Sequence, residues 1–257
     1  MFAQAISEAG LTAGSVPAML VVCLAGIVVF SATVQGFLGF GLSVVGMPVT
    51  LYLVGARDAN LLFTLLALLL TGGMTYRTRA HTRWGLALWL TLGALVGNPL
   101  GVYVLANADE SVVCRLLGIA ILSSAVFLLL NPKFQKHDMS VFWALPAGLV
   151  GGFFSGATSA GGPAAVIFLL LLGLPKDEMK ATLVAHFVLQ NAYKVGVLLV
   201  MGGLLQPVHV GLAAVLAVPL FVGMAVGMRA ARSFSTEAMR KVICVFLLIP
   251  GILMLLR

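Results

Sequence analysis

The sequence predicts an all-α polytopic membrane protein built from two inverted-topology repeats of about five helical segments each, in which short broken or re-entrant helices meet near the membrane midplane. Three observations lead to this fold class. Of the 257 residues, 61% are hydrophobic and only 9% are charged, whereas a soluble domain has about 25% charged residues. The apolar residues form ten separate segments. The order of features in the first five segments recurs in the last five.

The composition limits the classes of protein to which this chain can belong. A spanning helix needs about 20 apolar residues, so the segments account for the whole length and leave no room for a separate soluble domain. The mean hydropathy of +1.13 agrees with this interpretation. Soluble Rossmann enzymes, nucleic-acid-binding modules and disulfide-stapled secreted domains are excluded, and the lipid bilayer is the expected environment. The net charge of +7 is interpreted as a topology signal, so no nucleic-acid partner is expected.

The cysteines and the N-terminus give no sign of a cofactor or of a cleaved leader. Cys23, Cys114 and Cys244 all lie in apolar stretches and lack the paired spacings of a zinc or redox site. They are interpreted as packing residues, and neither a metal nor another cofactor is expected. The first residues contain Glu8 and no basic residue, since the first basic residue is Arg57, so no cleaved signal peptide is expected.

Two of the apolar segments are too short to cross a bilayer. Residues 47–55 and 163–173 number about ten each, below the ~17 residues that a spanning helix needs. The sequence does not decide whether each one crosses or turns back as a re-entrant hairpin, because both choices leave the later loops on the same side. The ten segments are residues 16–35, 47–55, 59–76, 84–106, 112–130, 141–154, 163–173, 179–203, 208–228 and 242–256.

A glycine-rich break precedes each short segment, from Gln35 to Pro48 and from Ser155 to Pro163. Neither break contains a charged residue, and irregular backbone at membrane depth is tolerated only where protein buries it or where it lines a cavity. We therefore expect both breaks to meet at one central site, with each proline in the first turn of the short helix. The structural alternative is that the glycines only let helices pack closely. The break residues assigned to the site are Gly39, Gly41, Ser43, Ser159, Gly161 and Gly162.

The second half of the chain repeats the first. A shift of 119 residues places Arg57-Asp58 on Lys176-Asp177, and both dipeptides are interpreted as paired turn residues. A shift of 126 residues places Gly97 and Gly101 on Gly223 and Gly227, with the same small-xxx-small spacing. The shared order of features divides the chain into a first repeat with an N-terminal tail, residues 1–133, and a second, inverted repeat, residues 134–257.

Lysine and arginine set the predicted orientation, because they are enriched in short cytoplasmic loops. In the first half, residues 77–83 hold three arginines and are placed inside, whereas residues 107–111 hold two acidic residues and are placed outside. In the second half, residues 203–209 carry no lysine or arginine, and residues 229–241 carry four. The corresponding turns are therefore inverted, and both termini are predicted to be non-cytoplasmic.

Polar residues recur at every fourth position in the segment at residues 179–203. They are His186, Gln190 and Lys194, and this spacing places them on one face of a helix. No acidic residue lies inside any apolar segment, and a buried ammonium group needs a partner. For Lys194 we predict a ligand, a cluster of carbonyl oxygens or water. A neutral or solvated lysine near a water-filled vestibule and a histidine bonded to a carbonyl are the structural alternatives.

Neutral donors complete the predicted site. Asn191 follows Gln190, and the 119-residue shift places Thr71 opposite Gln190 and Thr75 opposite Lys194. Together with Lys194 and the amide groups at the starts of the short helices, these donors suit a small anionic substrate. If transport is coupled to protons, His186 or Lys194 is the expected carrier, because the buried segments contain no carboxylate.

This combination of features resembles the TauE/SafE family of membrane transporters, the sulfite exporter-like permeases. The likeness extends from about Ser31 to Leu256 and rests on a glycine-rich break, a short helix and an acid-containing turn, present in both halves. The family's G-x-G-G-G run survives as Ala160-Gly161-Gly162-Pro163, whereas the first half has Phe40-Gly41-Leu42 and lacks the second glycine. The resemblance implies transport of sulfite, thiosulfate or organosulfonates such as sulfoacetate across a bacterial inner membrane.

The function predicted is therefore secondary transport of a small anion, a sulfur oxyanion or an organosulfonate, by alternating access, and no enzyme activity is expected. Transport of small carboxylates and an anion channel are the alternatives. A more remote alternative is an intramembrane serine hydrolase with Ser155 or Ser159 as nucleophile and His186 as base. The sequence leaves open the exact substrate, the direction of transport, the coupling ion and whether the protein forms an oligomer.

Overall fold

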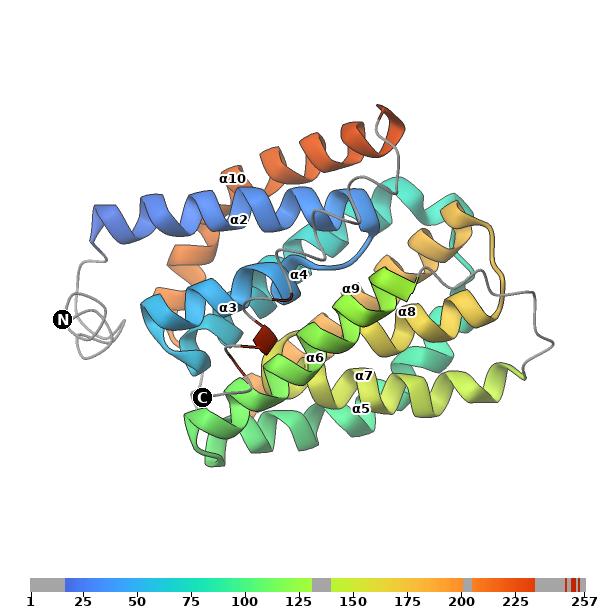
Figure 1. Cartoon of the computed structure of the whole chain (residues 1–257), viewed down its shortest axis with the longest axis horizontal. Helices are drawn as coiled ribbons and strands as arrows, with labels where there is room; N and C mark the ends of the chain where they lie inside the picture. Colours follow the sequence, from blue (N-terminus) through green and yellow to red (C-terminus); the bar gives the residue numbers. More distant parts are fainter. Residues whose placement is uncertain are drawn as a thin grey trace.

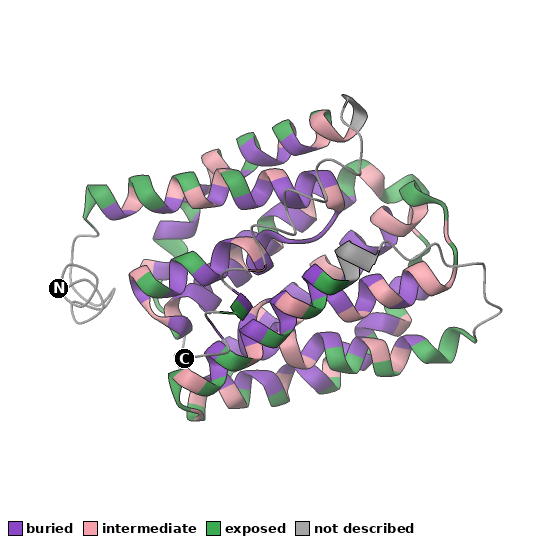
Figure 2. Ribbon diagram, in the orientation of Figure 1, coloured by how far each residue is buried: buried purple, intermediate pink, exposed green. Residues whose placement is uncertain are grey.

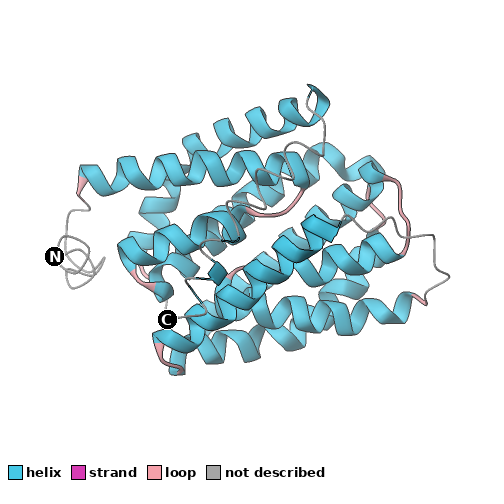
Figure 3. Ribbon diagram, viewed as in Figure 1, coloured by secondary structure: helices cyan, strands magenta, loops and turns pink. Residues whose placement is uncertain are grey.

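The computed structural model describes residues 17–130, 140–200 and 205–233, together with the isolated positions 248, 251, 252 and 254. In this part of the chain the structure is all-helical, with short turns and no strand (Figure 3). Two single 3-10 turns, η2 (Arg79–His81) and η3 (Val141–Trp143), precede α5 and α7. The α-helices are α2 (Ala18–Leu38), α3 (Leu42–Val54), α4 (Ala56–Thr78), α5 (Trp84–Asn107), α6 (Glu110–Leu130), α7 (Ala144–Thr158), α8 (Gly162–Leu171), α9 (Lys176–Val200) and α10 (Pro207–Ser233).

The helices agree closely with the apolar segments predicted from the sequence, and the all-α membrane class is confirmed. Each of the first nine segments corresponds to one helix, from α2 to α10. The tenth, residues 242–256, lies outside the described residues except at the isolated positions. Among the described helices, α2, α4, α5, α9 and α10, and α7 together with η3, are long and apolar enough to span a membrane. The helices α3 and α8, with 13 and 10 residues, are shorter.

The two breaks are narrower than predicted. The helix α2 continues to Leu38 and α3 begins at Leu42, while α7 continues to Thr158 and α8 begins at Gly162. Only residues 39–41 and 159–161 leave the helical path. The glycines at 36 and 156 lie within helices, because close contact with a neighbouring helix, rather than an unwound backbone, requires them there.

The predicted role of Pro48 is wrong, whereas that of Pro163 is confirmed. Pro163 lies in the first turn of α8, where the missing amide hydrogen costs no helical hydrogen bond. Pro48 lies inside α3, because this helix starts earlier, at Leu42. The start is set by Gly41, whose φ of 119° is not helical, and by the side chain of Gln35, which accepts a hydrogen bond from the Leu42 amide (2.9 Å).

The charged dipeptides also differ from the prediction, because they begin helices instead of forming turns. Asp58 lies in the first turn of α4 and Asp177 in the first turn of α9, where the helix dipole stabilises a carboxylate. Arg57 does not face its neighbour, since its Nη2 donates to the carbonyl oxygen of Ala106 (2.9 Å). The carboxylate of Asp58 instead contacts His209 at the start of α10.

Glycines allow two pairs of helices to pack backbone against backbone. A methyl group on Gly97 of α5 would overlap the Leu149 carbonyl oxygen of α7, and one on Gly227 of α10 would overlap the Thr33 carbonyl oxygen of α2. Such close approach is typical of small-xxx-small interfaces in membranes. Each pair joins one helix from residues 1–133 with one from residues 134–257, so both contacts lie between the two predicted repeats.

The paired helices form the flanks of the bundle. The helices α2 and α10 lie along one flank and α5 and α7 along the opposite flank, with α4 and α9 packed together between them (Figure 1). Buried positions concentrate between the helices, and exposed positions follow their outer faces (Figure 2). On α5 the exposed stripe is apolar and repeats about every four residues, as Leu88, Leu92, Val96, Leu100 and Tyr103. An apolar outer face on helices of spanning length identifies a multi-pass membrane protein.

Candidate functional site

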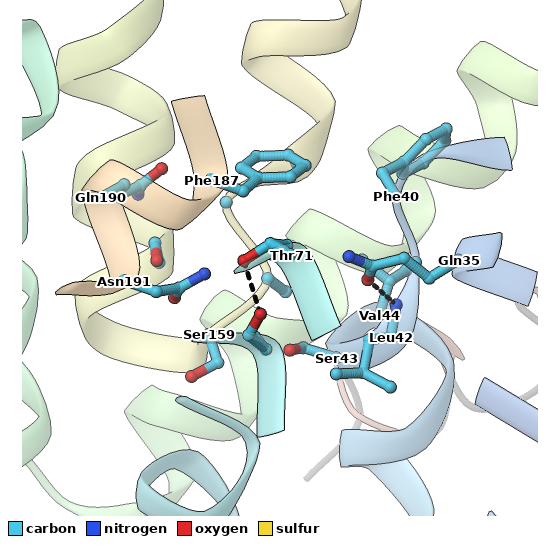
Figure 4. Close-up of a pocket in the computed structure, with 16 residues that line it drawn as sticks. Gln35, Phe40, Leu42, Ser43, Val44, Thr71, Ser159, Phe187, Gln190 and Asn191 are labelled. Carbon is cyan, nitrogen blue, oxygen red and sulfur yellow. Dashed lines mark hydrogen bonds between the residues drawn. The ribbon is translucent and has the colours of Figure 1, made fainter. Parts of the chain in front are cut away.

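The two breaks line one cavity within the helix bundle. Residues 40–44 and residues 159–162 form facing walls, and side chains of α4 and α9 lie between them (Figure 4). The cavity volume is about 40 Å³, which is room for about three water molecules. Its lining, within the described part of the chain, contains no charged side chain. The lining residues are Gln35, Phe40, Gly41, Leu42, Ser43, Val44, Ala67, Thr71, Ser155, Ser159, Ala160, Gly161, Gly162, Phe187, Gln190 and Asn191.

The first break places the start of α3 against the cavity. The first amide groups of a helix have no intrahelical acceptor. The Leu42 amide donates to the Gln35 side chain, and the Val45 amide donates to the carbonyl oxygen of Gly41 (3.0 Å). The amides of Ser43 and Val44 have no such partner in the described structure, and both residues line the cavity. A helix start with free amides is a site for negative charge.

The second break contains a strained residue. Ser159 has a φ of 55°, the one positive φ of a non-glycine residue in the described part of the chain. Residues with a side chain rarely adopt this left-handed conformation, and those that do cluster at helix ends and at functional sites. Two residues later, Gly161 directly precedes α8. Gly161 packs so closely on α7 that a methyl group added to it would overlap the Gly151 carbonyl oxygen. The first turn of α8 therefore reaches the cavity across from that of α3.

Lys194 lies directly behind Ser159, fully buried. Its ammonium group donates to the Ser159 hydroxyl (2.8 Å), to the amide oxygen of Asn60 (2.7 Å) and to the carbonyl oxygen of Ser155. Three donors thus meet three acceptors. Asn60 is itself oriented by α7, because its amide nitrogen donates to the carbonyl oxygen of Ala157 (2.8 Å). The Lys194 amino group therefore lies next to the cavity, but Lys194 is not one of the residues that line it.

Side chains of α4 and α9 supply neutral polar groups. The Gln190 nitrogen donates to the carbonyl oxygen of Gly151 (3.4 Å), and its oxygen has no partner in the described structure. Asn191 extends toward Thr71 and Ser159 from the same helix (Figure 4). Across the cavity, the Gln35 amide oxygen is occupied by Leu42, and its amide nitrogen points toward Thr71. Hydroxyl and amide groups therefore face the cavity from several helices.

The structure brings together most of the residues that the sequence assigned to the site. They come from both breaks and from two helices that are far apart in the sequence. Those that line the same cavity are Gly41, Ser43, Thr71, Ser159, Gly161, Gly162, Gln190 and Asn191.

Four assigned residues lie outside the cavity wall. Lys194 stands behind Ser159, and Gly39 lies on the far side of its break against the side chain of Lys180. The imidazole Nδ1 of His186 is 3.0 Å from the Thr91 hydroxyl of α5. Thr75 is buried without a hydrogen-bond partner in the described structure.

The expected pairing of Thr75 with Lys194 differs from the observed contact of Lys194 with Asn60. The helices α4 and α9 run antiparallel: Lys194, near the end of α9, meets Asn60 at the start of α4, and Glu178, at the start of α9, meets Arg83 beyond the end of α4. The 119-residue shift identifies equivalent positions. In antiparallel helices, equivalent positions away from the middle of the helix lie toward opposite ends, so Thr75 and Lys194 are not in contact, whereas Thr71 and Gln190, closer to the middle, line the same cavity.

Sequence reasoning missed several residues of this region. Gln35 was identified only as the start of a break, and Phe40 and Phe187 were not singled out among many aromatic residues. Asn60 was the easiest of the missed residues to detect as a candidate site residue, because it carries an amide side chain inside an apolar segment, as Gln190 does. Its partner, however, is 134 residues away, and no spacing in the sequence indicates such a contact.

The geometry gives no support to a serine–histidine pair. Ser159 bonds with Lys194, Asn60 and Thr64, whereas His186 bonds with a threonine of α5. A general base must lie within hydrogen-bond reach of its nucleophile.

Comparison with known proteins identifies a family for this chain. The family model described as sulfite exporter TauE/SafE matches residues 22–254. No curated protein and no solved structure matches the chain.

Proposed function

This chain belongs to the sulfite exporter TauE/SafE family of membrane transporters, and on that premise we propose that it moves a small anion, a sulfur oxyanion or an organosulfonate, across the membrane. The observation that carries the proposal is the cavity at the facing starts of α3 and α8. Each helix start carries about half a positive charge and free amide donors. Two of them at one cavity favour a negatively charged ligand.

The side chains of the cavity support an oxyanion in particular. Hydroxyl and amide groups of Ser43, Asn191 and Gln35 face the same space, and such groups donate hydrogen bonds to oxygen atoms. Among the described residues, no carboxylate lines the cavity to repel an anion. The small volume favours a ligand of a few non-hydrogen atoms. Small carboxylates share these properties, so the experiment below includes them.

The arrangement of the helices supports transport by alternating access between two inverted repeats, residues 1–133 and 134–257. The first helix of each half, α2 or α7, packs on the fourth helix of the other half, α10 or α5. Inverted repeats with broken helices that meet at the substrate site are the design of many secondary transporters. In this proposal the breaks form the fixed binding site, and the two halves move around it.

We further propose that the protein lies in a bacterial inner membrane with the turn at residues 79–83 inside. Both termini would then be outside, although residues 1–16 and 255–257 are outside the described part of the chain. If transport is coupled to protons, His186 is the better carrier, because its Nε2 has no partner in the described structure while Lys194 donates to three acceptors.

Counterflow in proteoliposomes tests the proposed function. Vesicles loaded with unlabelled sulfite, thiosulfate, sulfoacetate, acetate or oxalate are diluted into labelled sulfite or labelled acetate. We expect labelled sulfite to accumulate transiently in the vesicles that are loaded with a sulfur anion. Accumulation of labelled acetate in vesicles loaded with acetate or oxalate, without accumulation of labelled sulfite, would indicate the carboxylate alternative. Flux without counterflow would indicate a channel.

A matched pair of variants connects this transport to the cavity. Asn191→Leu removes an amide that lines the cavity, and Asn107→Leu makes the same change at the exposed end of α5. We expect only Asn191→Leu to reduce counterflow. Equal activities in the two variants would contradict the assignment of the site.

A further inference from the structure

Two lysines of α9 bind the C-terminal ends of the two helices that stop at the breaks. Lys194 donates to the carbonyl oxygen of Ser155, in the last turn of α7. Lys180 donates to the carbonyl oxygens of Gly36 (2.6 Å) and Phe37 (3.3 Å), in the last turn of α2. Both broken helices therefore end on an ammonium group, and both groups come from the same helix.

The backbone at the first break is shaped to admit the Lys180 side chain. Gly39 ends α2 with a φ of 90°. A Cβ atom at this position would lie 2.9 Å from Cγ of Lys180, too close for an ordinary contact. The absence of a side chain lets the stem of the lysine pass over the break and brings its ammonium group to the carbonyl oxygens.

The charge of Lys180 lies close to the cavity. Gln35, whose side chain lines the cavity, directly precedes Gly36, and Phe40 and Gly41 line it just after the break. The C-terminal end of a helix carries about half a negative charge. At the first break, only residues 39–41 separate this negative end of α2 from the positive start of α3. Without a cation it would oppose an anion at the free amides of α3.

We propose that Lys180 determines the affinity and charge preference of the cavity for anions without touching them, by offsetting the negative end of α2. This inference rests on the proposed function, because it assumes that the cavity binds an anion. Lys194 has the corresponding position on α7, but it also holds Ser159 in the cavity wall. Lys180 contacts no lining side chain through a hydrogen bond in the described structure, so its substitution separates charge from cavity geometry.

The experiment measures binding of three tetrahedral probes of similar size to the purified full chain by isothermal titration calorimetry. Sulfate carries two charges, methanesulfonate carries one and dimethyl sulfone carries none. Lys180→Gln removes the charge and keeps an N–H donor, whereas Lys180→Arg keeps both. Arg115→Gln is the control for loss of a positive charge, because Arg115 is an exposed residue of another helix, α6.

We expect Lys180→Gln to weaken methanesulfonate binding about threefold to tenfold and sulfate binding by a larger factor. Dimethyl sulfone should bind all variants alike, and Lys180→Arg and Arg115→Gln should resemble the wild type. An equal loss for charged and neutral probes would show a structural role and overturn the inference, as would no loss at all. A wild type that binds neither sulfate nor methanesulfonate would contradict the proposed function itself.

A second variant keeps the test independent of how well Lys180→Gln folds. Lys180→His changes the charge at this position within one molecule, because histidine gains its proton between about pH 8 and pH 5. Methanesulfonate, which stays singly charged over this range, should bind this variant more tightly at pH 5.5 than at pH 8, relative to the wild type. A constant ratio would overturn the inference.

Discussion

The imidazole Nε2 of His209 lies 3.2 Å from the carboxylate Oδ1 of Asp58 and joins the start of α10 to the start of α4. His209 Nδ1 accepts a hydrogen bond from the Gln206 amide (3.1 Å), so the proton of the neutral ring is on Nε2 and points at the carboxylate. At the other end of α4, Arg83 Nε lies 2.6 Å from Glu178 Oε2. The 126-residue shift places Arg83 on His209, so the two contacts occupy corresponding places in the two halves.

The two contacts should differ in their contribution to stability. The His209 side chain is 2% exposed, whereas the Arg83 side chain is 55% exposed. Asp58→Ala leaves a buried N–H without a partner, which costs about 1–3 kcal/mol. Glu178→Ala removes a surface ion pair, worth about 0–1 kcal/mol. Thermal unfolding in detergent should therefore show the larger decrease in Tm for Asp58→Ala, with Asp58→Asn in between, and similar decreases would contradict the assignment.

Lys194 and Asn60 should behave as one unit. Asn60→Leu removes an acceptor from a buried ammonium group, and a hydrogen bond to a charged group is worth about 1.5–3 kcal/mol. In the double variant with Lys194→Met the charge is absent, so the loss of free energy of unfolding should be smaller than the sum of the single losses, by about 1–3 kcal/mol. Chemical unfolding of all four proteins gives this coupling energy. Additive losses would show that the contact contributes nothing.

The glycine contact between α5 and α7 should not tolerate a methyl group. Gly97→Ala would force the Cβ atom onto the Leu149 carbonyl oxygen, and overpacking of this kind costs about 1–3 kcal/mol. Gly85→Ala is the control on the same helix, since no atom lies within 4 Å of a Cβ there, and alanine favours helix by up to about 1 kcal/mol. Opposite shifts in Tm are expected, and a neutral Gly97→Ala would contradict the close packing.

A negative charge at Gln35 should weaken anion binding without unfolding the first break. Gln35→Glu keeps the acceptor for the Leu42 amide and places a carboxylate at the cavity. At an effective dielectric constant of about 20, repulsion over a few ångströms lowers anion affinity by at least about tenfold. Gln35→Leu removes the acceptor as well and should lower Tm more. Counterflow and Tm of both variants separate the two effects, and full counterflow in Gln35→Glu would exclude Gln35 from the site.

The sequence predicted the helices well because membrane-spanning helices follow from composition and length. Charged residues and glycine or proline clusters mark the helix ends, and each predicted segment from 16–35 to 208–228 has its helix. Helix boundaries at the breaks were less accurate. Gly36 and Gly156 have the same composition signal as Gly39 and Gly161, but the first two pack against other helices and the latter two end or begin one.

The candidate site could be predicted in part. The repeat indicated that both breaks share one site, and periodicity placed Gln190 and Lys194 on one face of α9. Periodicity does not say what a face contacts. His186 lies on the same face and faces Thr91 of α5, while Lys194 reaches α4 and α7.

By itself, the sequence determined that this chain is a multi-pass helical protein with two short helices after glycine-rich breaks, because these properties depend on local composition and spacing. Only the tertiary structure decided that Lys194 donates to Asn60 and Ser155 while Lys180 donates to the end of α2. Both lysines are equally visible in the sequence as cations of one helix. Their roles depend on which helix end is within reach of each ammonium group, and that distance is set by the packing of helices far apart in the chain.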